Sequence, residues 1–359
     1  MPATSVHFNG SVNLPDADTV MREISRRVPD GVRRVTDGET GERGYWIMFQ
    51  LAKFREMPEF TVEHTGQAYA SADDAPPAAR LGLEDGVAPD SIAWPNLGYA
   101  DAYIESFTVY DRLQREGVIP AHVRFQIQYP TPLAAIAGAF TPRDMPAVLA
   151  SYEAALFADL GRALAAIDHR RVAVQWDVAV EFGLLEGAMG PVEHAPTQTP
   201  LDRLTPGLAR CVDQVSTDVP VGMHLCYGDY GHQHFKQPES LEMQVKLINA
   251  VSAAASRAID FVSFTVPQGR SDADYFAPLA ALLTAPSTEL AFGLVPYHPS
   301  EQAPGTTAAQ RVQIDAALAR STTGVRDWAI STECGLGRVA SDDVTALLDL
   351  HADLLRDQG

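Results

Sequence analysis

One histidine and two cysteines stand at the ends of predicted strands, in a spacing that could bind one metal ion. His224 and Cys226 lie at the end of the apolar run 219–225, and Cys334 follows the last β-like run, 327–331. Residues two apart on a strand point to the same side, about 6–7 Å from each other. Imidazole and thiolate are ligands that zinc prefers, and a catalytic zinc usually has three protein ligands and one open position. The pattern therefore predicts a Zn²⁺ site at His224, Cys226 and Cys334.

The same residues have a simpler interpretation, in which they pack and hydrogen-bond at strand ends without a metal. The third cysteine, Cys211, lies on the apolar face of a predicted helix, 201–215, and is interpreted as a core residue. Asp229, His232 and His234 follow the H-x-C pair. They are expected either to make hydrogen bonds within a loop, or to orient the metal-bound imidazole and supply a fourth ligand.

The elements that must position these residues alternate between β-like and helical patterns. β-branched and apolar runs lie at 5–12, 31–35, 122–128, 171–176, 219–225, 259–264, 289–295 and 327–331. Helical spacing lies at 16–28, 100–116, 144–167, 201–215, 238–257, 274–283, 306–320 and 342–355. This alternation indicates a parallel α/β protein. About eight strands and eight helices favour a (β/α)8 TIM barrel over an open sheet, because both edges can close.

The barrel prediction explains how distant residues could meet. Active sites in such barrels lie at the carboxyl ends of the strands, and the ends of the fifth and eighth strands face the same mouth. Cys334 can therefore approach the H-x-C pair. A single domain over residues 1–359 is predicted, with a surface insertion near residues 66–97 that is rich in Ala, Asp and Pro. The alternative for this insertion is a lid over the active site.

Composition excludes several classes of function. Of the 359 residues 46% are hydrophobic, enough for a sizeable core. The 27 Lys+Arg and 46 Asp+Glu give a net charge of −19, which disfavours nucleic acid and anionic membranes as partners. No apolar run approaches the roughly 20 residues that span a bilayer, and the first residues lack the pattern of a secretory signal. Only three cysteines favour a reducing compartment, and the expected location is the cytoplasm. The sequence leaves the oligomeric state open.

At this point the motifs resemble those of a known family. The H-x-C pair, followed far downstream by a strand that ends E-C-G-L-G, resembles the catalytic domain of cobalamin-independent methionine synthase. That domain belongs to the barrel superfamily shared with uroporphyrinogen decarboxylase. The resemblance covers most of the chain through short motifs that occur in the same order. It implies that His224, Cys226 and Cys334 bind zinc.

Four more residues take roles from this resemblance. Ser11, in Asn-Gly-Ser, matches a serine that contacts the carboxylate of an amino-acid substrate. Glu39, in Asp-Gly-Glu, matches a glutamate that binds the substrate ammonium, and Asp177, in Gln-Trp-Asp, would help to hold the same group. His298 matches a histidine that acts as an acid. The resemblance thus makes Glu39, Asp177 and His298 the candidate catalytic residues.

The sequence departs from the family at two of these motifs. Thr265 stands where the family has a glutamate that is its fourth zinc ligand, and Asp37 stands where the family has a histidine. Threonine is a poor zinc ligand at neutral pH, so water, substrate, Glu333 or a side chain of the 227–234 loop is expected to make the fourth bond. The full-length synthases also carry an N-terminal barrel, for which 359 residues leave no room. The methyl donor is therefore left open.

The function implied is transfer of a methyl or other alkyl group to a small-molecule thiol. Zinc with an open position can bind a thiol and lower its pKa, and a thiolate is the stronger nucleophile. One alternative is a zinc-dependent hydrolase or lyase in which Glu39 or Asp177 acts as general base toward water. Another is a metal-binding or ligand-binding protein without catalysis.

Aromatic residues near the predicted mouth could also take part in binding. They are expected either to stack against a planar donor or substrate, or to pack in the core. They are Trp46, Tyr129, Trp176, Tyr227 and Tyr297.

Overall fold

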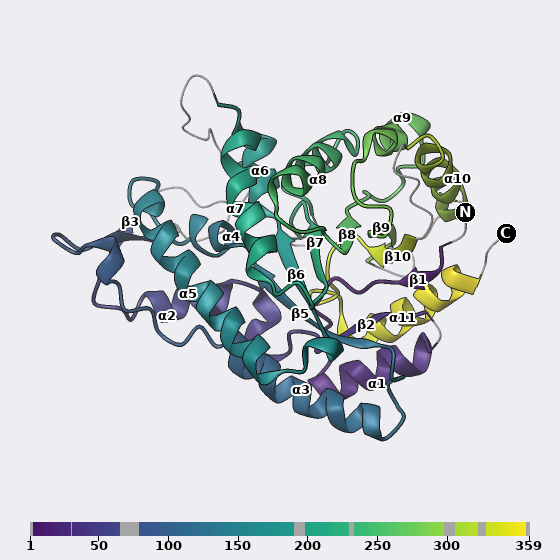
Figure 1. Cartoon of the computed structure of the whole chain (residues 1–359), viewed down its shortest axis with the longest axis horizontal. Coiled ribbons are helices and arrows are strands. Elements are labelled where there is room, and N and C mark those ends of the chain that lie inside the picture. Colours follow the sequence, from purple (N-terminus) through teal and green to yellow (C-terminus); the bar gives the residue numbers. More distant parts are fainter. Residues whose placement is uncertain are drawn as a thin grey trace.

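The fold is built on one parallel sheet. The computed structural model describes residues 3–29, 31–64, 79–189, 198–229, 233–297, 306–321 and 328–356. Its eight parallel strands are β1 (Ser5–Val6), β2 (Arg34–Thr36), β5 (Arg124–Pro130), β6 (Val172–Val178), β7 (Val221–Leu225), β8 (Phe261–Phe264), β9 (Glu289–Val295) and β10 (Trp328–Thr332). Their order is β1-β10-β9-β8-β7-β6-β5-β2. Nearly all strand residues are buried, as in parallel sheets covered on both faces. Figure 1 shows the helices around the outside of the curled sheet.

The sheet curls until its two end strands approach each other. Arg34 of β2 forms an ion pair with Glu289 of β9 at 2.8 Å, and its guanidinium lies 4.0 Å from the ring centre of Phe261 of β8. These strands are not sheet neighbours of β2, so their side chains meet inside the curl. An isolated parallel bridge joins Val6 to Val32 at the seam. The predicted α/β class is confirmed, and the sheet is TIM-barrel-like.

Helices follow the strands along the chain, as the alternating pattern predicted. The α-helices are α1 (Ala17–Arg27), α2 (Met48–Phe54), α3 (Tyr99–Arg115), α4 (Pro132–Ala137), α5 (Met145–Ala166), α6 (Val180–Leu185), α7 (Pro200–Gln214), α8 (Glu242–Ala254), α9 (Ala273–Phe276), α10 (Thr306–Leu318) and α11 (Ser341–Arg356). The 3-10 helices are η1 (Gly41–Tyr45), η2 (Pro89–Ser91), η3 (His169–Arg171) and η4 (Ala277–Ala281). No described helix is long and apolar enough to cross a membrane.

Three sequence expectations differ from the observed elements. The first predicted strand, 5–12, is a strand only at Ser5–Val6. The predicted helix 274–283 is divided into α9 and η4, and Pro278, which has no backbone N–H, stands at the start of η4. The short helices α2, α4 and α6 were not predicted, because about two turns are too few to produce a periodic pattern. The interpretation of Cys211 is confirmed, since it is fully buried on α7.

The described part of the predicted surface insertion, 79–97, contains β4 (Ala79–Leu83) and η2. Strand β4 pairs antiparallel with β3 (Phe60–His64). This hairpin lies at the periphery in Figure 1, beside α5. The Leu81 amide donates to the Ala139 carbonyl at 2.8 Å, and the rings of Phe60 and Phe140 pack edge to face. The insertion is thus anchored to the segment after α4, while residues 65–78 lie outside the described residues.

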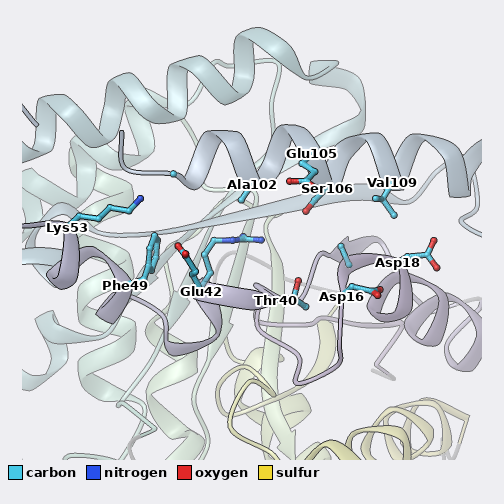
Figure 2. A pocket seen from close by; sticks show the side chains of 13 residues that line it. Asp16, Asp18, Thr40, Glu42, Phe49, Lys53, Ala102, Glu105, Ser106 and Val109 are labelled. Carbon is cyan, nitrogen blue, oxygen red and sulfur yellow. The ribbon is translucent and has the colours of Figure 1, made fainter. Parts of the chain in front are cut away.

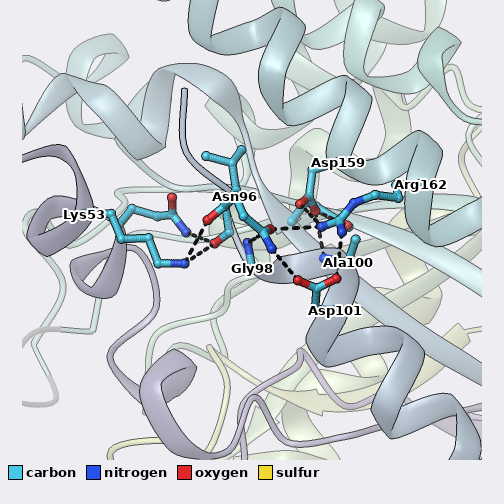
Figure 3. A network of polar contacts seen from close by, with 10 residues as sticks. Lys53, Asn96, Gly98, Ala100, Asp101, Asp159 and Arg162 are labelled. Carbon is cyan, nitrogen blue, oxygen red and sulfur yellow. Dashed lines mark hydrogen bonds and ion pairs between the residues drawn. The ribbon is translucent and has the colours of Figure 1, made fainter. Parts of the chain in front are cut away.

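Helix α3 is positioned by a polar network from α5, drawn in Figure 3. Gly98, at its N-cap, has no side chain to satisfy the first amides of the helix. Asp159 of α5 accepts a hydrogen bond from the Ala100 amide at 2.8 Å instead. Arg162 then pairs with Asp159 at 3.2 Å and with Asp101 at 2.7 Å. These contacts fix the end of α3, which carries residues that support the site described below.

The buried pair inside the curl yields a stability prediction. Arg34→Met should lower the free energy of unfolding by about 3–5 kcal/mol, because it leaves the Glu289 carboxylate buried without its closest partner. Replacing both residues, as in Arg34→Met with Glu289→Leu, should recover most of that loss. Arg26→Met is the control, since the Arg26–Glu23 pair is exposed and should matter little. Urea unfolding of the four proteins tests this, and equal losses for Arg34→Met and Arg26→Met would contradict it.

Candidate functional site

The three predicted metal ligands lie together at the carboxyl ends of β7 and β10, here called the mouth. The ligand atoms of His224, Cys226 and Cys334 all lie within 4.8 Å of one another, and the two Sγ atoms are 3.4 Å apart. The Cys226 amide donates to the Val178 carbonyl at 2.9 Å, which continues the ladder with β6 beyond β7. His224 and Cys226 therefore keep the alternation of a strand and face the same side. The three side chains converge as the strand pattern predicted.

The cluster has the chemistry of a cation site. His224 is 2% exposed, and within the described residues its ring nitrogens have no hydrogen-bond partner other than the Cys334 thiol, although both nitrogens of an imidazole are polar. The hydrogen bond from Cys226 and burial raise the pKa of Cys334 well above its usual value, and the nearby His224 lowers it only in part. If both cysteines are to be thiolates, a bound cation is needed to compensate their negative charges. Tetrahedral zinc places two cysteine sulfurs about 3.8 Å apart, close to the observed spacing.

Two carboxylates lie beside the cluster at the same mouth. Glu39 is 5% exposed and Asp177 is 7% exposed. Burial, and then the charge of Asp177, raise the pKa of Glu39 well above its usual value. Burial raises the pKa of Asp177 to about 6, against the opposing effect of His224 and of hydrogen bonds from Gln175 and Trp46. A pair of buried acids with raised pKa values is a site that a cationic group would stabilise.

Asp177 is oriented by two neutral donors. The Gln175 amide donates to Asp177 Oδ1 at 2.9 Å, and the Gln175 oxygen accepts from His7 in the interior of the curl at 2.9 Å. The indole N–H of Trp46 also donates a hydrogen bond to this carboxylate. Burial lowers the pKa of His7 to about 3, so His7 remains a neutral donor. Among the described residues, the hydrogen-bond partners of Asp177 are thus neutral side chains.

The segment that carries Glu39 and Trp46 has an unusual backbone. These two are the only described residues other than glycine with positive φ, at 49° and 55°. They flank η1, which turns the chain from β2 into α2. Such conformations cost on the order of 1–3 kcal/mol each and persist where the surroundings enforce them. Both side chains reach the mouth because of these turns.

Asp37 supports the segment that carries Glu39 and Trp46. It is fully buried and forms an ion pair with Arg43 of η1 at 2.6 Å. It also accepts hydrogen bonds from Ser106 of α3 at 2.8 Å and from the Glu39 amide at 3.0 Å. The sequence reasoning missed Arg43 and Ser106. The spacing of Asp37 and Arg43 across one tight turn was the only available signal, since Ser106 is remote in sequence.

Ser11 lies at the mouth, between the segment of Glu39 and the segment of Cys334. It bridges to Gly38, and its carbonyl accepts the Leu336 amide at 2.6 Å. A β-carbon at Gly335 or Gly337 would collide with the Ser11 side chain. The glycines of the E-C-G-L-G motif thus allow the segment after Cys334 to approach Ser11.

Of the two alternatives for the aromatic residues, the structure favours core packing for three of them. Tyr129, Trp176 and Tyr227 are fully buried and pack against other rings. Stacking on a planar ligand stays open for Trp46, which is half-buried, and for Tyr297, which is 8% exposed. The predicted acid His298 lies outside the described residues, as does His232.

A groove of about 430 Å³ lies on the outer side of η1, apart from the metal cluster (Figure 2). Figure 2 shows α3 along one wall, with Glu105 and Ser106, and α1 and α2 along the other. Glu42 and Lys53 bring opposite charges into the groove, which holds no imidazole or thiol. We therefore place the candidate site at the mouth and not in this groove.

Comparison with known proteins identifies structures that have a similar fold. No protein-family model matches the sequence, and no curated protein matches it. A putative vitamin-B12-independent methionine synthase from Listeria monocytogenes is 14% identical, with a TM-score of 0.58 over 99% of this chain and 98% of its own. The B12-independent methionine synthase of Shewanella sp. W3-18-1, in complex with selenomethionine, is 11% identical, with a TM-score of 0.59 over the same shares. The chain therefore has the fold of these proteins, as its motifs predicted.

The cluster predicts about one metal ion per chain. Cys226→Ser and Cys334→Ser should each lose most of the metal, because each removes one of three proposed ligands. Cys211→Ser is the matched control and should keep it, since Cys211 lies in the core under α7. Elemental analysis of protein purified without added metal measures this, and full metal content in both ligand variants would show that the cluster is not a metal site.

Proposed function

We propose that the protein transfers a methyl or other alkyl group to a thiol in a metal-dependent reaction, as a methyltransferase that resembles the homocysteine-methylating synthases. The observation that supports the proposal is a His/Cys/Cys cluster beside two buried carboxylates, at one mouth of a fold shared with B12-independent methionine synthases. The partners proposed are a small-molecule thiol and a methyl or alkyl donor. His224, Cys226 and Cys334 would hold Zn²⁺, which when bound would lower the pKa of the thiol so that a thiolate forms near neutral pH.

The chain's own residues would bind and orient the substrate. Glu39 and Asp177 hold the substrate ammonium, which supplies the cation that this pair of buried acids lacks. Ser11 offers a hydroxyl to the substrate carboxylate at the neighbouring edge of the mouth. His298 would protonate the leaving group. Fixing both ends of an amino acid places its thiol at the cluster and removes the entropic cost of a two-body encounter.

The remaining assignments belong to the same proposal. We take the metal to be zinc, because one imidazole and two thiolates are soft ligands that suit it. We take the chain to be one closed (β/α)8 barrel over residues 1–359. A reducing compartment such as the cytoplasm would keep Cys226 and Cys334 as thiols.

A second candidate function is supported by the raised pKa of Asp177. Its pKa of about 6 suits a general base that acts near neutral pH. With a metal at the cluster, Asp177 or Glu39 could take a proton from water, and the protein would then be a hydrolase or lyase for a small polar metabolite. Turnover of an ester, amide or thioether without any added thiol would favour this second function.

Thiol binding is the first test of the proposed transfer. Homocysteine, cysteine, glutathione and simple alkanethiols would each be added to the zinc-loaded protein, and the zinc neighbours measured by X-ray absorption. At least one thiol should add a third sulfur neighbour to the two cysteines. If none does, alkyl transfer to a thiol loses its basis and the hydrolase or lyase takes first place.

Substitution of Glu39 tests the ammonium site. Glu39→Gln should lower kcat/KM for an amino-acid thiol about 10–100-fold, mainly through KM, because it removes a charge-assisted hydrogen bond worth roughly 1.5–3 kcal/mol. Asp177→Asn should act in the same direction. Glu42→Gln, an exposed residue of the same segment, is the control. The interpretation fails if Glu39→Gln lowers kcat/KM for a thiol without an amino group by the same factor, or if the variant loses metal.

A further inference from the structure

Besides Glu39 and Asp177, which are assigned to the substrate, four described side chains near the cluster are candidates for a fourth metal ligand, and each is bonded elsewhere. Glu333 Oε2 lies 2.7 Å from His234 Nε2, and both side chains are 5% exposed. The other ring nitrogen of His234 contacts Gln237 at 3.1 Å. Asp229 faces Arg338, at 3.4 Å. The fourth side chain is Thr265, in the position where the family has its glutamate ligand.

The Thr265 hydroxyl connects the two strand ends that carry the cysteines. It donates toward the Leu225 carbonyl at 2.7 Å and toward the Glu333 carbonyl at 3.0 Å. Leu225 directly precedes Cys226, and Glu333 directly precedes Cys334. One hydroxyl on β8's extension therefore fixes the backbone beside both sulfurs. Because its hydrogen is shared between these carbonyls, the hydroxyl is a donor here and not a ligand.

Thr265 is itself held rigidly. It is fully buried, and the Gln244 side chain of α8 accepts from its amide at 3.0 Å and donates to its carbonyl at 2.9 Å. Tyr275 also donates to this carbonyl, at 3.2 Å. A threonine with its backbone fixed in this way presents the hydroxyl in one direction. This rigidity allows a single side chain to set the spacing of the two strand ends.

We propose that Thr265 is a positioning residue that holds Cys226 and Cys334 for a metal with three protein ligands. The chain thus replaces a ligand of the related synthases with a hydrogen bond that sets the geometry of two other ligands. The fourth position would then be filled by an exchangeable ligand such as water, and a substrate would replace that ligand without displacing a side chain. The inference rests on the metal site of the proposed function, but its tests use zinc alone and need no thiol or turnover.

Metal affinity tests the hydrogen bonds. Thr265→Val keeps the shape of the side chain and removes the hydroxyl, and it should bind zinc about 10–100-fold more weakly in competition with a chromophoric chelator. Thr265→Ser keeps the hydroxyl and should bind zinc like the wild type. Thr307→Val, which removes a buried hydroxyl on α10, is the control for a general effect of burial. Wild-type affinity in Thr265→Val, or equal losses in the valine and serine variants, would overturn the proposal.

The number of protein ligands is a second test that needs no variant at Thr265. Zinc-edge absorption of the wild-type protein should show two sulfur neighbours, one imidazole and one light neighbour. A second imidazole that disappears in His232→Ala or His298→Ala, or a carboxylate that disappears in Glu333→Gln, would show a fourth protein ligand and overturn the proposal. Three protein ligands together with no binding of any thiol would leave the role of Thr265 supported and remove the proposed alkyl transfer instead.

Discussion

The requirement that buried polar groups find partners governs the mouth of this sheet. Polar side chains removed from water cost free energy unless they are hydrogen-bonded or paired. Most groups at the mouth meet this requirement within the chain, as Asp37 does with Arg43 and Thr265 with two carbonyls. Two exceptions are His224, whose ring nitrogens have no oxygen or nitrogen partner among the described residues, and the Glu39–Asp177 pair, whose negative charges repel each other. A cation at the cluster and an ammonium between the acids would satisfy both exceptions, which is why these residues form the candidate site.

The backbone around the acids is held in costly conformations by contacts that lie outside the site. Glu39 and Trp46 both have positive φ, and each turn brings a side chain to the mouth. The buried Asp37–Arg43 pair secures the turn between them, and it is supported from α3. Helix α3 depends in turn on the network from α5 that Figure 3 shows. The geometry of the site is thus determined in part by contacts of α3 and α5, which lie outside the site, as expected for preorganised polar sites.

The two residues at which the sequence departs from the motifs it resembles, Asp37 and Thr265, share one physical outcome. Both side chains bond to the protein and position its neighbours. The fold of the two B12-independent methionine synthases is kept at 11% and 14% identity. Because many chemistries share this kind of barrel, the fold alone does not decide which reaction the altered mouth performs. Evidence about the reaction comes instead from the hydrogen-bond donors and acceptors at the mouth.

Local patterns in the sequence determined the strand and helix alternation and the H-x-C pair on one side of a strand. These features follow from residue periodicity and from bonds along one segment, so runs such as 171–176, 219–225 and 289–295 predicted strands that the structure has. Tertiary structure alone decided the contact of Ser106 with Asp37, the hydrogen bond of Trp46 to Asp177, and the use of Thr265 between two strand ends. Each of these joins residues far apart in the chain, and no local pattern records which distant carbonyl or carboxylate a side chain will meet. The short helices were missed, and the choice between packing and stacking for the aromatic residues was left open, because packing against remote segments, and not local spacing, fixes them.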